Sequence, residues 1–446
     1  MNPIGELLPS DELFCHQTTE TFATVATSDP AWTEKVCAMA MARDGSLQIG
    51  FGLGKYTNRN VMDGYAALSR GPEQLTVRAS RRLAPQPEIT TVGPIRYEVL
   101  EPMRAVRFVL EPNDVLPVSF DWTFRAELPA FPEERTHLRA AYRVMAELVR
   151  YHQIGVPEGW IELDGECHEL SPEGWVSTRD HSWGVRYDVG VPPVDVEGAV
   201  TEIPAGVGFM MLWAPILMER PDGSRYGLHL HLTRYAMPGF DQTSVTAGVE
   251  HPDGRREPIV GLVPDLRFDP ENRRLLGGSL LARMEDGTDR PLQLEVLDDT
   301  GVHLGAGLYF GFDGHHHGEF RGELGSGEVD QFSHVRAPYC SSPRIDDTRN
   351  IPSAASGALA SASSCDSTSA TTSRRMTLLI GIGWLVAGTS SLATSLTFAM
   401  LVRIEPSSLV SEATSASVRA MRARPARCCT RPWPVPTRRC PCPRWP

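Results

Sequence analysis

The residue types needed for acid/base chemistry are concentrated in one segment, Trp175–Arg186 (WVSTRDHSWGVR). Side chains alternate between the two faces of an extended strand, so Arg179, His181 and Trp183 would share one face and Asp180 would lie on the other. The shared face is suited to line a cavity, with Asp180 supporting its wall. The same residues also fit a structural role, in which the tryptophans border the core and Asp180 pairs with a solvated arginine.

A second group of candidate residues is the pair His229 and His231. Their i, i+2 spacing places both imidazoles on one side of a strand, as in two-histidine metal sites on sheets, and His181 would be the third ligand. Hydrogen-bonded histidines in a cavity wall have the same spacing, and no carboxylate lies at a local ligand spacing. We therefore predict that both histidines line a substrate site and that the chain binds no metal and no cofactor.

Turn residues at regular intervals indicate an all-β body. Apolar runs of strand length are separated by Glu-Pro or Asp-Gly pairs, at 101–102, 164–165, 222–223, 253–254 and 286–287. Regular turns without intervening helices are typical of antiparallel barrels or sandwiches and exclude a βαβ arrangement. One amphipathic helix is expected at 133–150, where apolar residues recur at three- and four-residue intervals.

The charge balance separates an acidic body from a basic tail. The formal net charge is −12, although residues 341–446 hold thirteen arginines against five acidic residues, so the preceding part is strongly acidic. Lys35 and Lys55 are the lysines of the whole chain. This composition argues against an electrostatic groove for nucleic acid, and we expect no nucleic acid as a partner.

Cysteine spacing and the first residues both favour the cytoplasm. Cys15, Cys37, Cys167 and Cys340 are scattered and lack the spacing of a disulfide framework, which fits a reducing compartment. Met1–Cys15 has neither the basic region nor the apolar region of a secretory signal. We therefore predict a cytoplasmic protein, while the composition leaves its oligomeric state open.

The chain beyond residue 337 differs in composition from the body. Residues 337–375 form a Ser/Ala/Thr-rich linker and 403–446 an Arg/Pro/Cys-rich tail, both predicted to be disordered. Between them, 376–402 is an uncharged run of 27 residues, long enough for a transmembrane helix. One hypothesis is a membrane anchor, which would place the protein at a membrane. The other is a frameshift near residue 340, which the Arg-rich, Lys-free composition favours.

Four motifs resemble those of a bacterial family of uncharacterised proteins with two lipocalin-like barrels. They are YHQIG at 151–155, DGE at 164–166, RDHSWGVR at 179–186 and DGHHHGEFRGE at 313–323. That family is distantly similar to the carotenoid 1,2-hydratases (hydroxyneurosporene synthases), which carry a similar Asp-His-x-Trp, and to fungal tandem-lipocalin cyclases. The resemblance implies two consecutive lipocalin-like antiparallel β-barrels, at 1–165 and 166–336, with an apolar cavity and a site near the domain seam.

The resemblance also assigns roles to residues of this chain. It makes Asp180 the proton donor or its support, His181 the acid/base partner, and Trp183 a wall that stabilises a cation. Protonating an alkene needs an acid in an apolar pocket, where desolvation raises the pKa of a carboxyl group. A nearby arginine would keep the Asp180 carboxylate ionised, which favours His181 as the acid and Asp180 as its anchor. The residues assigned to substrate binding are Arg179, Trp175, Trp183, Arg186, His229 and His231.

Three functions are compatible with these features. The first is an enzyme, a hydratase or isomerase, that binds a hydrophobic isoprenoid, steroid or fatty molecule and acts on it by acid/base chemistry. The second is a non-catalytic lipid-binding protein, because the sequence shows no complete catalytic triad. The third is a metal-dependent β-barrel enzyme that uses His229 and His231.

Overall fold

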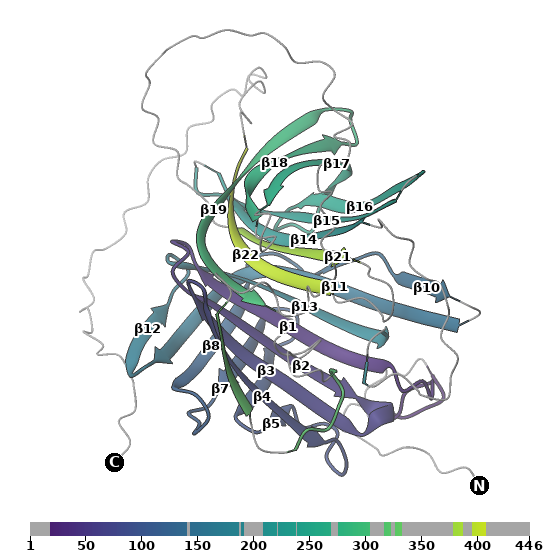
Figure 1. Ribbon diagram of the computed structural model, residues 1–446, viewed down its shortest axis with the longest axis vertical. Helices are drawn as coiled ribbons and strands as arrows, with labels where there is room; N and C mark the ends of the chain where they lie inside the picture. Colours follow the sequence, from purple (N-terminus) through teal and green to yellow (C-terminus); the bar gives the residue numbers. More distant parts are fainter. Residues whose placement is uncertain are drawn as a thin grey trace, which may run out of the picture.

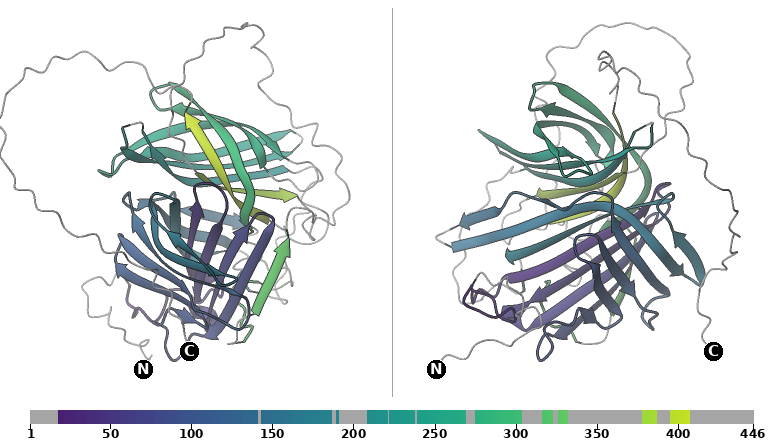
Figure 2. Two further views of the ribbon diagram at one scale, coloured as in Figure 1. Left: turned by 90° about the vertical axis from the view of Figure 1, so that its left-hand side faces the viewer. Right: turned by 180° about the vertical axis from the view of Figure 1, so that it is seen from behind.

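The protein consists of two antiparallel β-sheets, one lying above the other (Figures 1 and 2). Apart from the 3₁₀ turn η2 (Thr57–Arg59), each helix or strand element in the described residues is a strand, so the predicted all-β fold is confirmed. The computed structural model describes residues 18–140, 143–186, 189–190, 208–220, 222–237, 239–268, 275–303, 316–322, 326–331, 378–386 and 395–406.

The first sheet has fourteen strands and an open path. Along that path the strands are β20 (Ser326–Gln331), β4 (Glu73–Arg82), β3 (Val61–Arg70), β2 (Gln48–Tyr56), β1 (Trp32–Ala42), β13 (Trp175–Val185), β11 (Arg143–Leu163), β8 (Val118–Ala126), β7 (Ala105–Leu110), β6 (Ile95–Glu101) and β5 (Thr91–Val92). Three further strands pair with β11: β9 (Phe131–Pro132), β10 (Thr136–Ala140) and β12 (Glu166–Leu170).

The second sheet closes into a barrel of eight strands. In order around the barrel these are β14 (Gly208–Glu219), β15 (Arg225–Met237), β16 (Phe240–Glu250), β17 (Arg256–Phe268), β18 (Leu275–Met284), β19 (Asp289–His303), β22 (Ser395–Pro406) and β21 (Leu378–Val386).

Strand β1 is buried on both faces, because the first sheet has a core on each side. Ala38 belongs to the cluster on the face that turns away from the barrel. Met39 and Met41 belong to a separate cluster that also contains Leu217 of β14 and Val302 of β19. Apolar contacts between the sheet and the barrel therefore hold the two bodies together.

The predicted Asp-Gly turns are confirmed. Asp164 and Gly165 have φ values of 53° and 82° and connect β11 directly to β12, as a two-residue hairpin turn requires. Gly223, Gly254 and Gly287, in the three other Asp-Gly pairs, also have positive φ. These pairs were predictable because their backbone conformation restricts the residue type locally.

The helix expected at 133–150 is wrong. Thr136–Ala140 forms β10, and Arg143–Leu163 forms the 21-residue strand β11. Leu138, which was expected on the buried face of the helix, is 50% exposed on β10. Apolar residues point to both faces of β11 between 143 and 150, so their spacing can imitate a helical period.

The first sheet extends beyond residue 165, where the first barrel was expected to end. Both β12 and β13 pair with β11. Strand β13 also pairs with β1, the first strand along the chain. Strand β20 pairs with β4, so the chain returns to the first sheet after completing most of the barrel. Long-range strand pairing of this kind leaves no signal in local composition.

The segment 376–402 contains no membrane helix in the described residues. Leu378–Val386 and the part of Ser395–Pro406 that overlaps it form strands β21 and β22, which close the barrel between β14 and β19. The apolar run consists of two strand-length pieces separated by small and polar residues, and its total length alone suggested a helix. Across the described residues, no helix is long and apolar enough to cross a membrane.

Candidate functional site

Two of the sequence motifs lie side by side on neighbouring strands. In the register of β11 and β13, Tyr151 is opposite His181, His152 opposite Asp180 and Gln153 opposite Arg179. Alternation along both strands then divides these side chains into two sets, one on each face of the sheet. The predicted separation of Arg179 and His181 from Asp180 is therefore present.

The set on the face that turns away from the barrel contains Arg179. This side chain is 3% exposed, and its Nε and Nη2 donate hydrogen bonds of 2.9 and 2.6 Å to Oε1 of Gln153. The guanidinium carbon lies 5.4 Å from the ring centroids of both Phe124 and Tyr151. No acidic side chain of the described residues forms an ion pair with Arg179, so its charge is buried among neutral and aromatic groups.

His181 connects a tyrosine to a carboxylate on the same face. Its Nε2 lies 3.0 Å from Oε1 of Glu34 on β1, and its Nδ1 lies 3.2 Å from the hydroxyl of Tyr151 on β11. A carboxylate only accepts, so Nε2 carries the proton, and Nδ1 accepts from the phenol. Desolvation raises the pKa of Glu34, but the hydrogen bond from His181 and nearby positive charge, including that of Lys55, outweigh it and lower that pKa. We call Glu34, Tyr151 and His181 the acid/base group.

The two tryptophans of the motif have different positions. Trp183 is 36% exposed, and its indole meets the rings of His181 and Tyr151 edge-on, with centroids 5.6 and 6.4 Å away. Trp175 is 6% exposed and belongs to the core cluster of the first sheet. The structure therefore places Trp183 beside the acid/base group and Trp175 in the core.

Asp180 lies on the other face, next to Cys37 of β1 and away from His181. Burial raises its pKa, and the charges of Arg150 and Arg186 offset this only in part. The flanking arginine was expected to keep the Asp180 carboxylate ionised by lowering its pKa. In the structure, desolvation raises this pKa by more than the arginines lower it. The anchor of His181 is Glu34, whereas Arg186 donates a 2.8 Å hydrogen bond to Ser182.

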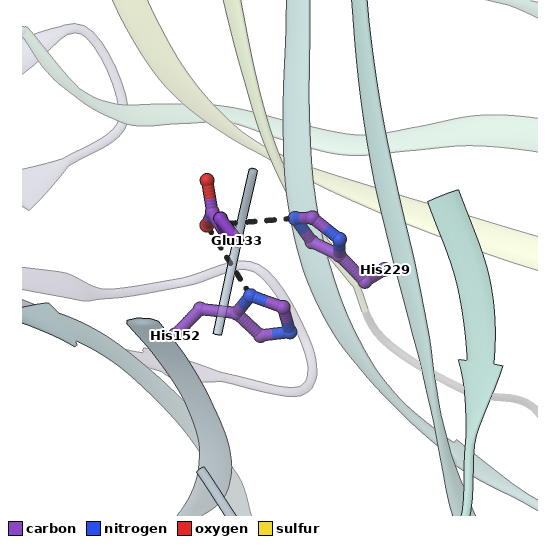
Figure 3. Close-up of side chains that lie close together, drawn as sticks. All are labelled: Glu133, His152 and His229. Atoms are coloured by element: carbon purple, nitrogen blue, oxygen red, sulfur yellow. Dashed lines mark hydrogen bonds and ion pairs between the residues drawn. The ribbon is translucent and has the colours of Figure 1, made fainter. Parts of the chain in front are cut away.

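His229 belongs to a group of polar side chains separate from the acid/base group. This group lies where the barrel meets the first sheet (Figure 3). Glu133 follows β9 and His152 lies on β11, while His229 and Glu250 lie on β15 and β16. One ligand atom from each of Glu133, His152 and His229 lies within 4.8 Å of the others. We call these three residues and Glu250 the interface cluster.

His152 is fully buried between two carboxylates. Its Nδ1 lies 3.2 Å from Oε1 of Glu133, and its Nε2 lies 2.9 Å from Oε1 of Glu250. Burial lowers the pKa of His152, but the hydrogen bonds with Glu133 and Glu250 raise it by more than burial lowers it. The net pKa of His152 is therefore above its ordinary value. Because both neighbours only accept, the imidazole donates from both nitrogens.

The His229 ring stacks on that of His152 at a centroid distance of 3.9 Å. Burial and the charge of His152 hold the pKa of His229 well below its ordinary value. Its Nδ1 accepts a 3.2 Å hydrogen bond from Arg256, while its Nε2 has no hydrogen-bond partner in the described residues and lies 3.7 Å from Oε1 of Glu133. Burial also lowers the pKa of the partly exposed His231 to about 4.

Glu133 holds the interface cluster together. Its carboxylate accepts hydrogen bonds from the guanidinium of Arg150 and, at 2.8 Å, from the indole Nε1 of Trp213. Burial raises its pKa, yet the charge of Arg150 and the hydrogen bond of His152 lower it to a net value well below the ordinary range. Glu133 is therefore ionised throughout the neutral range.

His317, in the last of the four motifs, is a buried side chain. It is 1% exposed, and Lys35 Nζ lies 2.5 Å from its Nδ1. Burial, the charge of Lys35 and that of Arg186 lower the pKa of His317 well below its ordinary value. The neighbouring His315 lies outside the described residues. This motif thus packs the 316–322 segment against the first sheet.

Sequence reasoning missed Glu34, Tyr151, Glu133 and Glu250 as functional candidates. Tyr151 stood at the start of a quoted motif, and its role was readable only from the register of β11 with β13. Glu34, Glu133 and Glu250 carry no motif, and each meets its histidine through long-range pairing. His181, the expected third metal ligand, lies on the opposite face from His152 of the interface cluster.

Comparison with known families adds one assignment. The model of a family of unknown function, DUF8625, matches residues 7–336. The chain belongs to this family. The DUF8625 match includes the acid/base group and the interface cluster, and it ends before the tail. No curated protein matches the sequence.

Solved structures resemble this DUF8625 protein only loosely. A protein of Nitrosomonas europaea assigned as AttH has 13% identity and a TM-score of 0.40, covering 61% of this chain and 82% of that chain. Kievitone hydratase from Nectria haematococca has 11% identity and a TM-score of 0.32, covering 86% and 93%. CghA solved with Sch210972 has 11% identity and a TM-score of 0.36, covering 84% and 89%. Likeness at this level carries no conclusion about activity.

Proposed function

We propose that the protein binds a hydrophobic small molecule on the first sheet and hydrates or isomerises it through the acid/base group. The observation that carries the proposal is the chain of contacts from Glu34 through His181 to the hydroxyl of Tyr151. It occupies a partly exposed position beside Trp183, next to the apolar core of the sheet. A phenol, an imidazole and an indole thus lie in one place, which supports assigning them the roles of proton donor, relay and aromatic wall.

The chemistry of the acid/base group follows from its proton positions. Tyr151 donates its proton to one carbon of the substrate, and the Arg179 Nη1, 3.4 Å from the phenol oxygen, stabilises the resulting tyrosinate. In hydration, water then bonds to the cationic carbon and its proton returns through His181 to Tyr151. In isomerisation, the substrate instead loses a proton from another carbon to the same oxygen. Trp183 stabilises positive charge between the two steps.

Arg179 indicates what else the substrate carries. A buried guanidinium without an acidic partner in the described residues is costly, and an anionic ligand would remove that cost. We therefore expect a lipophilic substrate with an acidic oxygen, such as a carboxylate or an enolate. Its oxygen would pair with Arg179 while the reacting carbon faces Tyr151.

Mass spectrometry of lipophilic extracts that co-purify with the full chain would identify the ligand. The identified compound is then incubated with the wild type and with Tyr151→Phe and His181→Gln. We expect both variants to bind it and to lose at least about 100-fold in turnover, as removal of a general acid/base residue does. Tyr235→Phe, on the exposed surface of the barrel, is the matched control and should keep full turnover.

A second function, non-catalytic lipid binding, makes the opposite prediction. The wild type would then hold the compound unchanged, and Tyr151→Phe would alter affinity alone. Full turnover by both variants would exclude the acid/base group from the reaction.

A further inference from the structure

We infer that Glu133, His152 and His229 form a binding site for one divalent transition-metal ion, zinc being the ion that fits best. The site is separate from the acid/base group, because His152 and Tyr151 are adjacent on β11 and face opposite sides of the sheet. It also differs from the His229, His231 and His181 set that local spacing suggested.

Two of the three separations between ligand atoms are suitable, and one imidazole must turn out of the His152–His229 stack, whose planes are 21° apart, for both nitrogens to face one ion. Nδ1 of His152 and Nε2 of His229 lie 3.2 and 3.7 Å from the same oxygen, Oε1 of Glu133 (Figure 3). Zinc bonds of about 2.0–2.2 Å in tetrahedral geometry place ligand atoms about 3.3–3.6 Å apart. Two imidazoles and one carboxylate are a set that zinc uses where its fourth position stays open.

His229 provides the independent observation that points to a ligand. Its side chain is fully buried, yet Nε2 has no hydrogen-bond partner in the described residues and is directed at Glu133. Leaving a buried polar nitrogen without a partner costs about 1–3 kcal/mol. A metal ion between this nitrogen and Oε1 of Glu133 would give the nitrogen a partner, while Oε1 keeps its hydrogen bond from Trp213.

The surroundings of His152 match those of a metal ligand. When Nδ1 binds the metal, Nε2–H donates to Glu250 at 2.9 Å, which gives the carboxylate–histidine–metal arrangement common around zinc. Arg150 binds the other oxygen of Glu133, so the metal would bind Oε1, which also accepts the 2.8 Å hydrogen bond from Trp213. Glu133, His152 and His229 would thus be the direct ligands, and Glu250 would support His152.

Metal binding requires a defined proton balance. The ion replaces the proton on Nδ1 of His152, and this proton leaves to solvent. On His229 the proton moves from Nε2 to Nδ1, so Arg256, which is 26% exposed and 3.7 Å from Oε1 of Glu250, must turn from His229 toward that carboxylate. One proton is released for each ion bound, and affinity therefore falls as the pH is lowered.

The bound ion would connect the two bodies of the protein. His152 belongs to the first sheet and Glu133 directly follows its strand β9, whereas His229 belongs to the barrel. A metal that binds only the folded arrangement stabilises it by mass action. Zinc should therefore raise the unfolding temperature of the full chain.

The test uses the full-length protein, stripped with a chelator and titrated with zinc chloride. We expect about one tightly bound ion per chain for the wild type. His229→Gln and Glu133→Gln should weaken binding at least about 100-fold, and Glu250→Gln about 10–100-fold, as loss of a supporting group does. His137→Gln is the matched control, since its exposed ring is 3.7 Å from Glu147, outside the cluster.

Two further measurements keep the result interpretable. Circular dichroism melting shows whether each variant is folded, and X-ray absorption of the zinc-loaded wild type needs no variant. The spectrum should show nitrogen and oxygen neighbours at about 2.0–2.1 Å with imidazole scattering. Absence of stoichiometric zinc, unchanged zinc in folded His229→Gln, or sulfur neighbours at about 2.3 Å, which would place the ion on cysteines, would overturn the inference.

Discussion

Tyr151 and His181 are directly opposite each other on β11 and β13, and the phenol oxygen of one lies 3.2 Å from Nδ1 of the other. This pairing brings together the YHQIG motif at 151–155 and the RDHSWGVR motif at 179–186. Glu34, on the strand beyond, fixes the proton on Nε2 of His181. The order of strands β1, β13 and β11 thus brings Glu34, His181 and Tyr151 into one chain of hydrogen bonds.

Replacing Gly184 with alanine should destabilise the protein by at least about 2 kcal/mol. Gly184 has φ 133°, and a Cβ there would overlap the carbonyl oxygen of Glu147 on β11. The glycine of the Ser-Trp-Gly motif therefore allows β11 to approach β13. Urea unfolding measures the effect, with Gly174→Ala, whose Cβ would make only ordinary contact, as the control. Equal midpoints for both variants would contradict this explanation.

Removing Glu133 should cost about 3–5 kcal/mol of folding free energy, because Arg150 would lose its ion pair with Glu133 and the buried His152 would lose one of its two carboxylates. The measurement is urea unfolding of Glu133→Ala in the presence of a chelator, so that metal makes no contribution. Glu147→Ala is the control, since its ion pair with Arg135 is exposed and should contribute less than about 1 kcal/mol. A loss below that value for Glu133→Ala would mean that the cluster is not coupled to folding.

Asp180→Asn should raise the unfolding temperature at neutral pH. The folded state raises the pKa of Asp180 above its ordinary value of 3.8, so the folded protein binds this proton more tightly than the unfolded chain. Stability consequently falls as the pH rises from 3.8 through the folded pKa, and the asparagine variant avoids that loss. Melting curves between pH 3 and 8 should show a gain at neutral pH that disappears near pH 4. A variant less stable than the wild type at pH 7 would show that Asp180 has a stabilising partner.

Cys37 should react with thiol reagents far more slowly than Cys167. Burial and the charge of Asp180 raise the pKa of Cys37 to about 12, whereas Cys167 is exposed. The thiolate is the reactive form, so at pH 8 we expect a rate difference on the order of 1000-fold. Peptide mass spectrometry after timed labelling of the folded protein gives both rates. Equal rates would mean that the environment of Cys37 opens readily.

Local patterns were sufficient to predict the all-β class, the Asp-Gly turns and the shared face of Arg179 and His181. Each of these depends on a period of two residues or on the conformation of a single residue. The helix at 133–150 failed because β11 is apolar on both faces, which removes the alternation that identifies a strand.

Partners across strands could not be predicted from the sequence. Glu34 is far from His181 along the chain, and Glu133 reaches His229 only because the barrel packs against the first sheet. Register and docking decide these contacts, and neither leaves a signal in local spacing. The same limitation made Asp180 the expected anchor of His181, since adjacency in sequence was the available guide.

Solvent deuterium provides the most direct test of the central claim, that Tyr151 and His181 move a proton to and from a bound lipophilic compound. The compound that co-purifies with the full chain is incubated in D₂O with the wild type and with Tyr151→Phe, and its mass is followed over time. We predict that the wild type introduces one deuterium on carbon, with or without addition of water, and that Tyr151→Phe introduces it at least about 100-fold more slowly. Equal incorporation by the two proteins, or none by the wild type, would contradict the account.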